Sequence, residues 1–284
     1  MFLLFYAVVC ALLTNSEAGR LGAFGERAFD TWFEHKDICD SSVPARKILY
    51  FTYKFDLLSR GHQLDDFEKV NAENVRHTLT FFPDVEVRFE TDESCERILR
   101  GLSGMFKDLL TFFQNEKRGM YKSDICRGAL LFLTGGMYMD VDLEVQMDVR
   151  KLISTNTSFT TVYMRTEHGE PYFFQAFIYV DRPCHPVIYQ YLQDLMAYYR
   201  GFYKWNGVLV GVQAMGTAFK KWQKQLDLKI QFQEYYNHTM PANARYIHKR
   251  TGNKVDCNVA VYDHISKKVP FYSRAIGASV GCPH

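Results

Sequence analysis

The chain has 284 residues, of which 47% are hydrophobic and 23% are charged, a composition that suits a globular protein with one substantial core or two small ones. Its formal net charge of +2 excludes the strong basic field of most nucleic-acid-binding proteins, so we expect no nucleic-acid partner. The aromatic share of 15% is high, but a large core uses such rings as readily as a sugar site does.

The first 18 residues are predicted to be a signal peptide or a short signal anchor. Residues 2–13 form an apolar run without a charge, which is shorter than the roughly 20 residues that a membrane span needs. Ser16-Glu17-Ala18 offers a small-x-small cleavage site. We therefore expect entry into the secretory pathway, with membrane association through the N-terminus if the segment is retained. Residues 19–45 show no clear period and are predicted to be a leader or stem.

The cysteines agree with a secretory location. There are seven, and six remain when Cys10 in the predicted signal segment is set aside. An even number suits disulfides in an oxidising compartment, and the lack of any Cys-x-x-Cys pair argues against a zinc site. The sequence leaves the connectivity open, and Cys126, inside a predicted helix, is the cysteine most expected to be a buried thiol. Two sequons, at Asn156 and Asn237, are compatible with luminal glycosylation.

Taken in order, the patterns predict alternating strands and helices. Residues 47–53 are rich in β-formers and predict a buried strand, and a helical apolar stripe follows over 64–82. A short alternating strand over 85–89 and a helix opening at 91–95 complete a βαβα order, which is typical of an α/β fold with right-handed crossovers. Residues 103–122 look like a loop or irregular helix. Later predicted elements are strands at 159–164, 172–180, 229–235 and 254–263, and a helix at 188–199.

The stretch from Ser123 to Val145 carries the clearest chemistry. Ser123-Asp124 is predicted to cap an apolar helix that Gly135-Gly136 ends, and a strand over 137–139 then runs into Asp140-Val141-Asp142. Residues i and i+2 of a strand share a face, so the two carboxylates would converge and suit Mg²⁺ or Mn²⁺ with open positions for substrate phosphates.

The acidic triplet has two other possible interpretations. Short acidic triplets are common on solvated loops, and this is the ordinary alternative. An EF-hand calcium loop starting at Asp140 fails, because Val145 and Lys151 occupy its glycine and glutamate positions.

The composite resembles the sugar-binding region of the DXD-containing glycosyltransferases of family 32, whose relatives include α-1,6-mannosyltransferases and inositolphosphoceramide mannosyltransferases. The family pattern is matched by Ser123-Asp124, Arg127, Gly135-Gly136-Met137-Tyr138 and Asp140-Val141-Asp142. The resemblance covers about residues 46–200 and is thin beyond them. It implies a GT-A-type nucleotide-diphospho-sugar transferase fold, with a single Rossmann-like mixed sheet flanked by helices, and a catalytic domain over 46–284.

The resemblance also implies roles for individual residues. Asp124 would bond the donor sugar or its ribose, Arg127 would orient the donor and Gln175 would face the sugar ring; these three are the catalytic candidates. The metal candidates are Asp140, Asp142 and His264, with Mn²⁺ or Mg²⁺ as the cofactor. The donor-binding candidates are Tyr50, Thr52, Asp124, Arg127, Gly135, Gly136, Tyr138 and Asp140. The alternatives left open are a plain core strand around Tyr50, an ion pair between Asp124 and Arg127, and a surface role for His264.

We therefore expect a retaining, metal-dependent glycosyltransferase of the secretory pathway lumen, with the Golgi favoured and secretion as the alternative. It would move a hexose, with mannose among the options, from a nucleotide-diphosphate sugar to a glycan, glycolipid or protein acceptor. The main alternative is a catalytically inactive luminal protein of the same fold that binds a sugar or nucleotide sugar. A hydrolase using Asp140 and Asp142 is disfavoured, because opposed carboxylates should flank the substrate.

Overall fold

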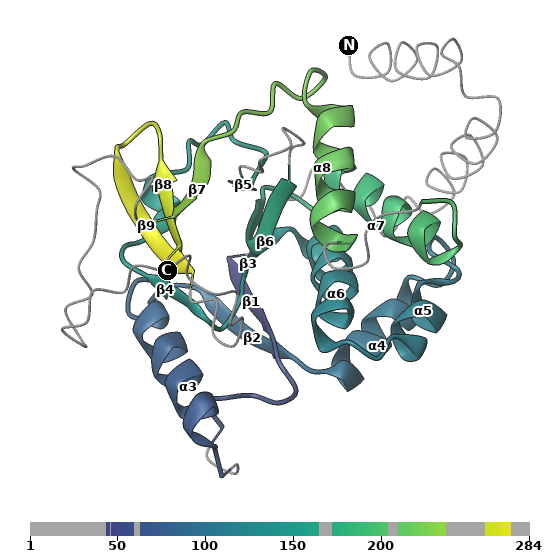
Figure 1. Cartoon of the computed structure of the whole chain (residues 1–284), viewed down its shortest axis with the longest axis horizontal. Helices are drawn as coiled ribbons and strands as arrows, with labels where there is room; N and C mark the ends of the chain where they lie inside the picture. The colour runs from purple at the N-terminus through teal and green to yellow at the C-terminus, as the bar shows by residue number, and fades with distance from the viewer. Residues whose placement is uncertain are drawn as a thin grey trace, which may run out of the picture. The chain divides into compact units, whose positions relative to one another are not determined.

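A computed structural model of the chain (Figure 1) describes residues 44–45, 47–59, 63–164, 172–203, 210–236 and 259–273. These residues belong to one compact unit that spans 41–284. The predicted signal segment, most of the predicted leader and the sequon at Asn237 lie outside the described residues. Within the described ranges, no helix has both the length and the apolar character that a membrane span requires.

One mixed sheet holds the described strands together. Its order is β2-β1-β3-β6-β5-β7-β8-β9-β4. The strands are β1 (Ile48–Thr52), β2 (Glu86–Glu90), β3 (Gly136–Met139), β4 (Leu143–Val145), β5 (Phe159–Met164), β6 (Tyr172–Val180), β7 (Phe232–Tyr236), β8 (Val259–Asp263) and β9 (Lys268–Ser273). Strand β1 pairs in parallel with β2 and β3, whereas β6 runs antiparallel to both β3 and β5.

Helices flank this sheet. They are α3 (Asp66–Leu79), α4 (Asp92–Gly101), α5 (Leu109–Asn115), α6 (Gly119–Thr134), α7 (Pro186–Tyr199) and α8 (Val210–Trp222), with a short 3₁₀ turn η1 (Val149–Lys151). Helix α3 packs against β4, whereas α6 contacts β1 and β3 and α8 contacts β6, as Figure 1 shows. The expected class, an α/β fold with a single mixed sheet flanked by helices, is confirmed.

Alternation along the central strands decides which side chains face which helix. Leu49, Phe51, Met137 and Met139 belong to the core cluster that also contains Ala72 and Val75 of α3. The residues between them therefore point to the other face. There the hydroxyl of Tyr138 meets Ser123 of α6 at 3.1 Å. This alternation directs Tyr138 toward the helix that carries the central motif.

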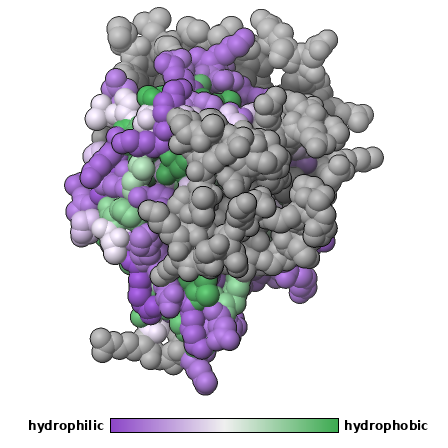
Figure 2. Space-filling view, turned by 60° about the vertical axis from the view of Figure 1, so that its left-hand side comes forward, coloured by the Kyte–Doolittle hydropathy of each residue, from purple (hydrophilic) through white to green (hydrophobic). Residues whose placement is uncertain are grey.

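The described surface is mainly hydrophilic on the face that Figure 2 shows. Large hydrophobic side chains that are exposed are spread over several elements, and the described ones are Phe67, Val70, Met120, Phe202, Ile230 and Ile265. Scattered residues of this kind are normal on a soluble surface and indicate no binding patch.

Two local predictions need correction. Helix α6 begins at Gly119, with Arg118 as its N-cap, so Ser123 and Asp124 lie inside the helix and do not cap it. Strand β3 ends at Met139, and Asp140–Asp142 form a turn before β4. The strand rule for i and i+2 therefore does not apply to the two aspartates. Helix α5 lies within residues 103–122, which were predicted as a loop or irregular helix, whereas the strands β4 and β9 were not predicted.

Candidate active site

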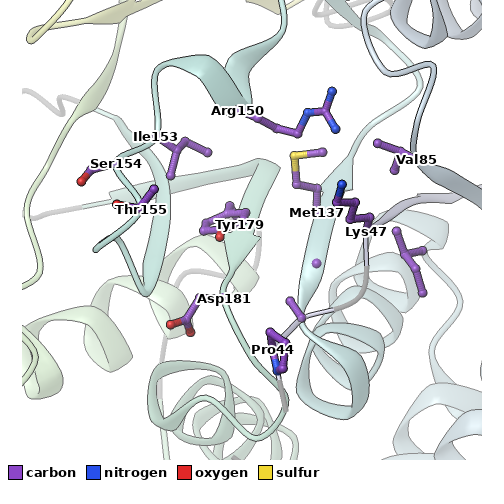
Figure 3. A pocket seen from close by; sticks show the side chains of 13 residues that line it. Pro44, Lys47, Val85, Met137, Arg150, Ile153, Ser154, Thr155, Tyr179 and Asp181 are labelled. Carbon is purple, nitrogen blue, oxygen red and sulfur yellow. The ribbon is translucent and has the colours of Figure 1, made fainter. Parts of the chain in front are cut away.

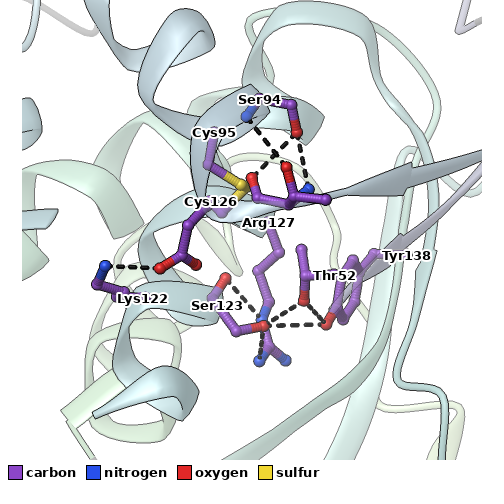
Figure 4. The surroundings of a disulfide bond; sticks show 10 residues. Thr52, Ser94, Cys95, Lys122, Ser123, Cys126, Arg127 and Tyr138 are labelled. Carbon is purple, nitrogen blue, oxygen red and sulfur yellow. Dashed lines mark hydrogen bonds and ion pairs between the residues drawn. A yellow bond between two sulfur atoms is a disulfide. The ribbon is translucent and has the colours of Figure 1, made fainter. Parts of the chain in front are cut away.

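Three hydroxyl groups meet where α6 crosses the ends of β1 and β3. Thr52 Oγ1 lies 2.5 Å from Ser123 Oγ and 2.7 Å from the Tyr138 hydroxyl. Figure 4 shows these side chains converging from the two strands and the helix, with Arg127 beside them. Ser123 and Arg127 share one face of α6 because they are four residues apart. Thr52, a predicted donor-binding residue, is therefore brought to the central motif.

Arg127 occupies the middle of this cluster and is only 5% exposed. Its guanidinium donates to the carbonyl of Gln175 at 2.7 Å and to Ser123 Oγ at 2.9 Å. It also lies 3.4 Å from a carboxylate oxygen of both Asp124 and Asp140. The Cζ atom of Arg127 lies over the Tyr138 ring, 4.5 Å from the ring centroid. A buried charge needs such partners, and these hold Arg127 in one place.

Electrostatics separate the two carboxylates beside Arg127. The Asp124 side chain is 14% exposed and that of Asp140 is 31% exposed. Burial raises the pKa of Asp124 to about 7, with Arg127 opposing the shift and Asp140 adding to it. Burial disfavours the charged form of Arg127, but Tyr138, Asp140 and Asp124 outweigh it and raise the pKa of Arg127, which therefore stays protonated. The Asp124–Arg127 ion pair that we left open as an alternative is present.

Gln175 reaches the same cluster from β6 and is buried. Its amide nitrogen donates to the carbonyl of Gly211 at 2.7 Å, and the Tyr191 hydroxyl donates to its side-chain oxygen at 3.3 Å. The same hydroxyl lies 2.9 Å from the carbonyl oxygen of Asp124, so its one hydrogen is shared between two acceptors. Gly211 must be a glycine here, because a Cβ atom would lie 2.3 Å from Asp124 Oδ2.

Sequence reasoning missed Tyr191 and Gly211 as parts of the site. A tyrosine on the apolar stripe of a helix is typical of a core residue, and no local pattern distinguishes Tyr191 from one. Gly211 stands out only as one of several glycines before and within α8. Their roles depend on α7 and α8 packing against α6, which the sequence does not display.

Asp140 and Asp142 lie in the turn after β3. Asp140 Oδ1 accepts a hydrogen bond from the Tyr138 hydroxyl at 2.5 Å, so this carboxylate is oriented by its neighbour on the strand. Both side chains are partly exposed. Two hard carboxylates with room for water and substrate phosphates are what Mg²⁺ and Mn²⁺ commonly use in proteins, so the donor set fits the predicted cation.

His264 is not brought to these aspartates. Its Nε2 lies 3.1 Å from the Tyr235 hydroxyl and 3.0 Å from Gln233 Oε1, because the turn after β8 is hydrogen-bonded back to β7. Among the residues that the structure describes, no three His, Cys, Asp or Glu side chains are grouped as a metal site. Among the described residues, the predicted set of Asp140, Asp142 and His264 is therefore not brought together, and the two aspartates remain the candidate pair.

Three predicted donor-binding residues also lie elsewhere. Tyr50 is fully buried and its hydroxyl bonds Thr134 Oγ1 at 2.9 Å, as a core strand residue would. Gly135 precedes β3 and Gly136 is its first residue, whereas Asp140 follows its other end. Gly135 has φ 61°, and a Cβ atom there would lie 2.8 Å from that of Ala45, so the glycine serves the helix-to-strand turn.

Gly136 instead borders a cavity of about 320 Å³ at the far end of the strands. Figure 3 shows the side chains of Met137, Arg150, Tyr179 and Asp181 around it. None of the residues in the polar cluster lines this cavity. It therefore belongs to a different end of the sheet from the candidate site.

Helix α6 is tied to α4 on the side away from the strands. Cys126 forms a disulfide with Cys95, so the expectation of a buried thiol at Cys126 is wrong. Lys122 adds an ion pair to Asp92 at 2.7 Å (Figure 4). Cys126 and Arg127 are adjacent in α6 and therefore point in different directions. The Cys126 sulfur faces α4, and the Arg127 guanidinium faces the site.

Residues 68–159 match the model of a glycosyltransferase sugar-binding region containing a DXD motif. A search of curated proteins found no match. Among solved structures, the chain is similar to one described as PaToxG Glycosyltransferase, at 15% identity and TM-score 0.44, covering 70% of this chain and 80% of that one. It is also similar to a transferase mutant, at 10% identity and TM-score 0.35, covering 66% and 88%.

Both TM-scores are low, and neither likeness carries any part of the assignment. The family model does, because its range contains Ser123, Asp124, Arg127, Tyr138 and the Asp140–Asp142 turn. Membership of family 32 in particular stays a prediction. The predicted enzyme class is confirmed at the level of this region, because residues 68–159 match the model of the DXD-containing sugar-binding region of glycosyltransferases.

Proposed function

We propose that this glycosyltransferase is metal-dependent and moves a hexose from a nucleotide-diphosphate sugar to a glycan, glycolipid or protein acceptor. The observation that carries the proposal is the position of the Asp140–Asp142 turn beside the buried Arg127 cluster. Asp140 contacts both Tyr138 and Arg127, so the acidic turn and the polar cluster form one site.

The chemistry of glycosyl transfer suits these groups. The leaving diphosphate gains negative charge in the transition state, and a divalent cation held by Asp140 and Asp142 would offset that charge. Asp124, with a pKa of about 7, can accept a hydrogen bond from a sugar hydroxyl when ionised and donate one when protonated. Arg127 orients the carboxylates of Asp124 and Asp140 through its ion pairs with them. Retention of configuration is proposed from the family resemblance.

A second candidate is a protein that binds a nucleotide sugar without turnover. The burial of Gln175 favours it, because both ends of that amide are engaged by Gly211 and Tyr191. The donor sugar, the acceptor and the linkage follow from neither candidate. A location in the secretory lumen is proposed from the apolar N-terminal run and is supported by the Cys95–Cys126 disulfide, since such bonds persist in oxidising compartments.

The test is donor hydrolysis by the purified chain across a panel of UDP- and GDP-sugars, with Mn²⁺ and then with EDTA. We expect nucleotide release from one donor that depends on Mn²⁺. Asp142→Ala should lower the rate on the order of 10²-fold or more, as the loss of an electrostatic stabiliser does. Asp66→Ala, which removes a fully exposed carboxylate on α3, is the matched control and should keep normal turnover.

Each other outcome points to a different function. Near-normal turnover by Asp142→Ala would exclude the metal assignment. Nucleotide binding without release from any donor, with glycan acceptors present, would favour the binding protein. Release of sugar from a simple glycoside without any nucleotide would favour the hydrolase.

A further inference from the structure

Helix α3 carries a buried amide that contacts the acidic turn directly. Asn74 is only 4% exposed. Its side-chain nitrogen donates to the carbonyl oxygens of Val141 at 2.8 Å and Leu143 at 2.5 Å. These two carbonyls lie on either side of Asp142 in the chain. Asn74 therefore forms hydrogen bonds to the backbone of both residues that flank Asp142, a predicted metal ligand.

The contact uses the full donor capacity of the residue. A side-chain amide has two N–H groups, and the two carbonyls of the turn can take one each. Within the turn, the backbone hydrogen bond from the Leu143 amide to the Asp140 carbonyl is 3.2 Å long, and the Asp140 amide donates to the Ala176 carbonyl of β6 at 2.8 Å. Removing Asn74 would leave the carbonyls of Val141 and Leu143 without this donor, and an unsatisfied buried polar group is unfavourable.

Helix α3 is itself firmly placed. Asp65 and Glu68 form a capping box at its start. Glu68 also pairs with Lys54, which follows β1, at 2.5 Å. Val75 packs in the same core cluster as Val141 and Leu143. The amide of Asn74 is therefore presented to the turn from a rigid support.

We propose that Asn74 is a positioning residue that sets the direction of the Asp140–Asp142 carboxylates for a divalent cation. The inference rests on the proposed metal-dependent function. Groups that orient metal ligands from behind typically change metal affinity or activity by about 10–100-fold when they are removed. Asn74 acts through the backbone of the turn and touches neither sugar nor phosphate in this scheme.

The experiment compares Asn74→Ala and Asn74→Ser with the control Val75→Ala in the full chain. Alanine removes both donors, serine can retain one, and Val75→Ala loosens the same helix without touching the turn carbonyls. The first measurement is amide hydrogen exchange of the metal-free protein over residues 137–146. The second is Mn²⁺ binding, followed by the paramagnetic resonance signal of the free ion.

We expect faster exchange confined to the turn and a Mn²⁺ dissociation constant raised about 10-fold or more in Asn74→Ala. Asn74→Ser should lie between that variant and the wild type. Val75→Ala should exchange faster across α3 and the core while binding Mn²⁺ normally. These results together would support the positioning role.

Two results would overturn it. The first is wild-type Mn²⁺ affinity in Asn74→Ala, and the second is an exchange pattern in that variant that matches Val75→Ala. A wild-type protein that binds no Mn²⁺ would instead remove the proposed function. In that case the exchange data would still show whether Asn74 holds the turn, so the two failures are distinguishable.

Discussion

The surroundings of the Asp124–Arg127 ion pair determine the protonation of each partner. Both side chains are largely buried, yet they differ in what burial does to them. Arg127 has several partners and remains charged, whereas the pKa of Asp124 rises to about 7 because burial outweighs the attraction of Arg127. A carboxyl group that changes charge near neutral pH is suited to a site that exchanges hydrogen bonds with sugar hydroxyls.

The shifted Asp124 pKa predicts a pH dependence of stability. The pKa of an Asp in an unfolded chain is about 3.9, whereas that of folded Asp124 is about 7. Between roughly pH 4 and 7, the folded state therefore holds a proton that the unfolded state releases. Stability from this group therefore falls as pH rises through that window and levels off above it. From pH 5 to pH 8, the free energy of unfolding of the wild type should fall by roughly 2–3 kcal/mol more than that of Asp124→Asn.

Urea unfolding of both proteins at the two pH values, with EDTA present, measures this difference. The two proteins have the same sequence except at residue 124, so the difference between their pH dependences reports on that position. Parallel pH dependences would contradict a raised Asp124 pKa.

At the scale of elements, the site depends on how α6 is anchored. The helix presents Ser123, Asp124 and Arg127 toward the strands, while Cys126 bonds α4 behind it. The α4–α6 tie combines a disulfide with the Lys122–Asp92 ion pair. The covalent bond closes a sequence separation of 31 residues, which restricts the unfolded chain.

These two ties should differ in strength. Replacing both Cys95 and Cys126 by alanine should lower the free energy of unfolding by about 3–4 kcal/mol, the loop-entropy value for this separation. Lys122→Ala removes the partly exposed ion pair with Asp92 and the contact of the Lys122 ammonium with the Phe113 ring, and it should cost less, about 1 kcal/mol. Chemical denaturation of the two variants tests the contrast, and equal losses would count against it.

At the scale of the whole molecule, the acidic turn joins the two ends of the sheet. It follows β3 near one edge and leads into β4, which is the opposite edge strand and pairs with β9. Phe271 of β9 meets Phe177 of β6 with ring centroids 5.1 Å apart, although these strands are not neighbours in the sheet. The last described strand is thus part of the core that supports the turn.

Phe271→Ala should therefore be costly although it lies far from the motif in sequence. Truncating a fully buried phenylalanine typically costs about 3–5 kcal/mol, and we expect the loss of donor hydrolysis to follow the loss of folded protein. The exposed Ile265 on the preceding turn is the control, and Ile265→Ala should stay within about 0.5 kcal/mol of the wild type. Thermal unfolding of both variants tests this prediction. A Phe271→Ala protein with the stability of the wild type would show that the Phe271 side chain is not needed for the stability of the core.

The sequence by itself determined the elements whose patterns are long and local. The strands β5 and β6 have the predicted bounds, and helix α3 lies within its predicted stripe, because hydrophobic period and burial agree there. The grouping of Ser123, Asp124, Arg127, Tyr138 and Asp140 was also predictable, since they lie within one short helix-turn-strand unit. Local geometry alone brings them together.

Tertiary structure decided the rest. Thr52, Gln175, Tyr191, Gly211 and Asn74 reach the site from separate elements, whose packing no local pattern records. The same packing kept His264 and the Gly135-Gly136 pair away from Asp140 and Asp142. Strands as short as β4 carry too few residues for a period, and they form because a partner such as β9 supplies the hydrogen bonds. Contacts between distant segments depend on the summed burial of the whole core, which becomes definite only in the folded chain.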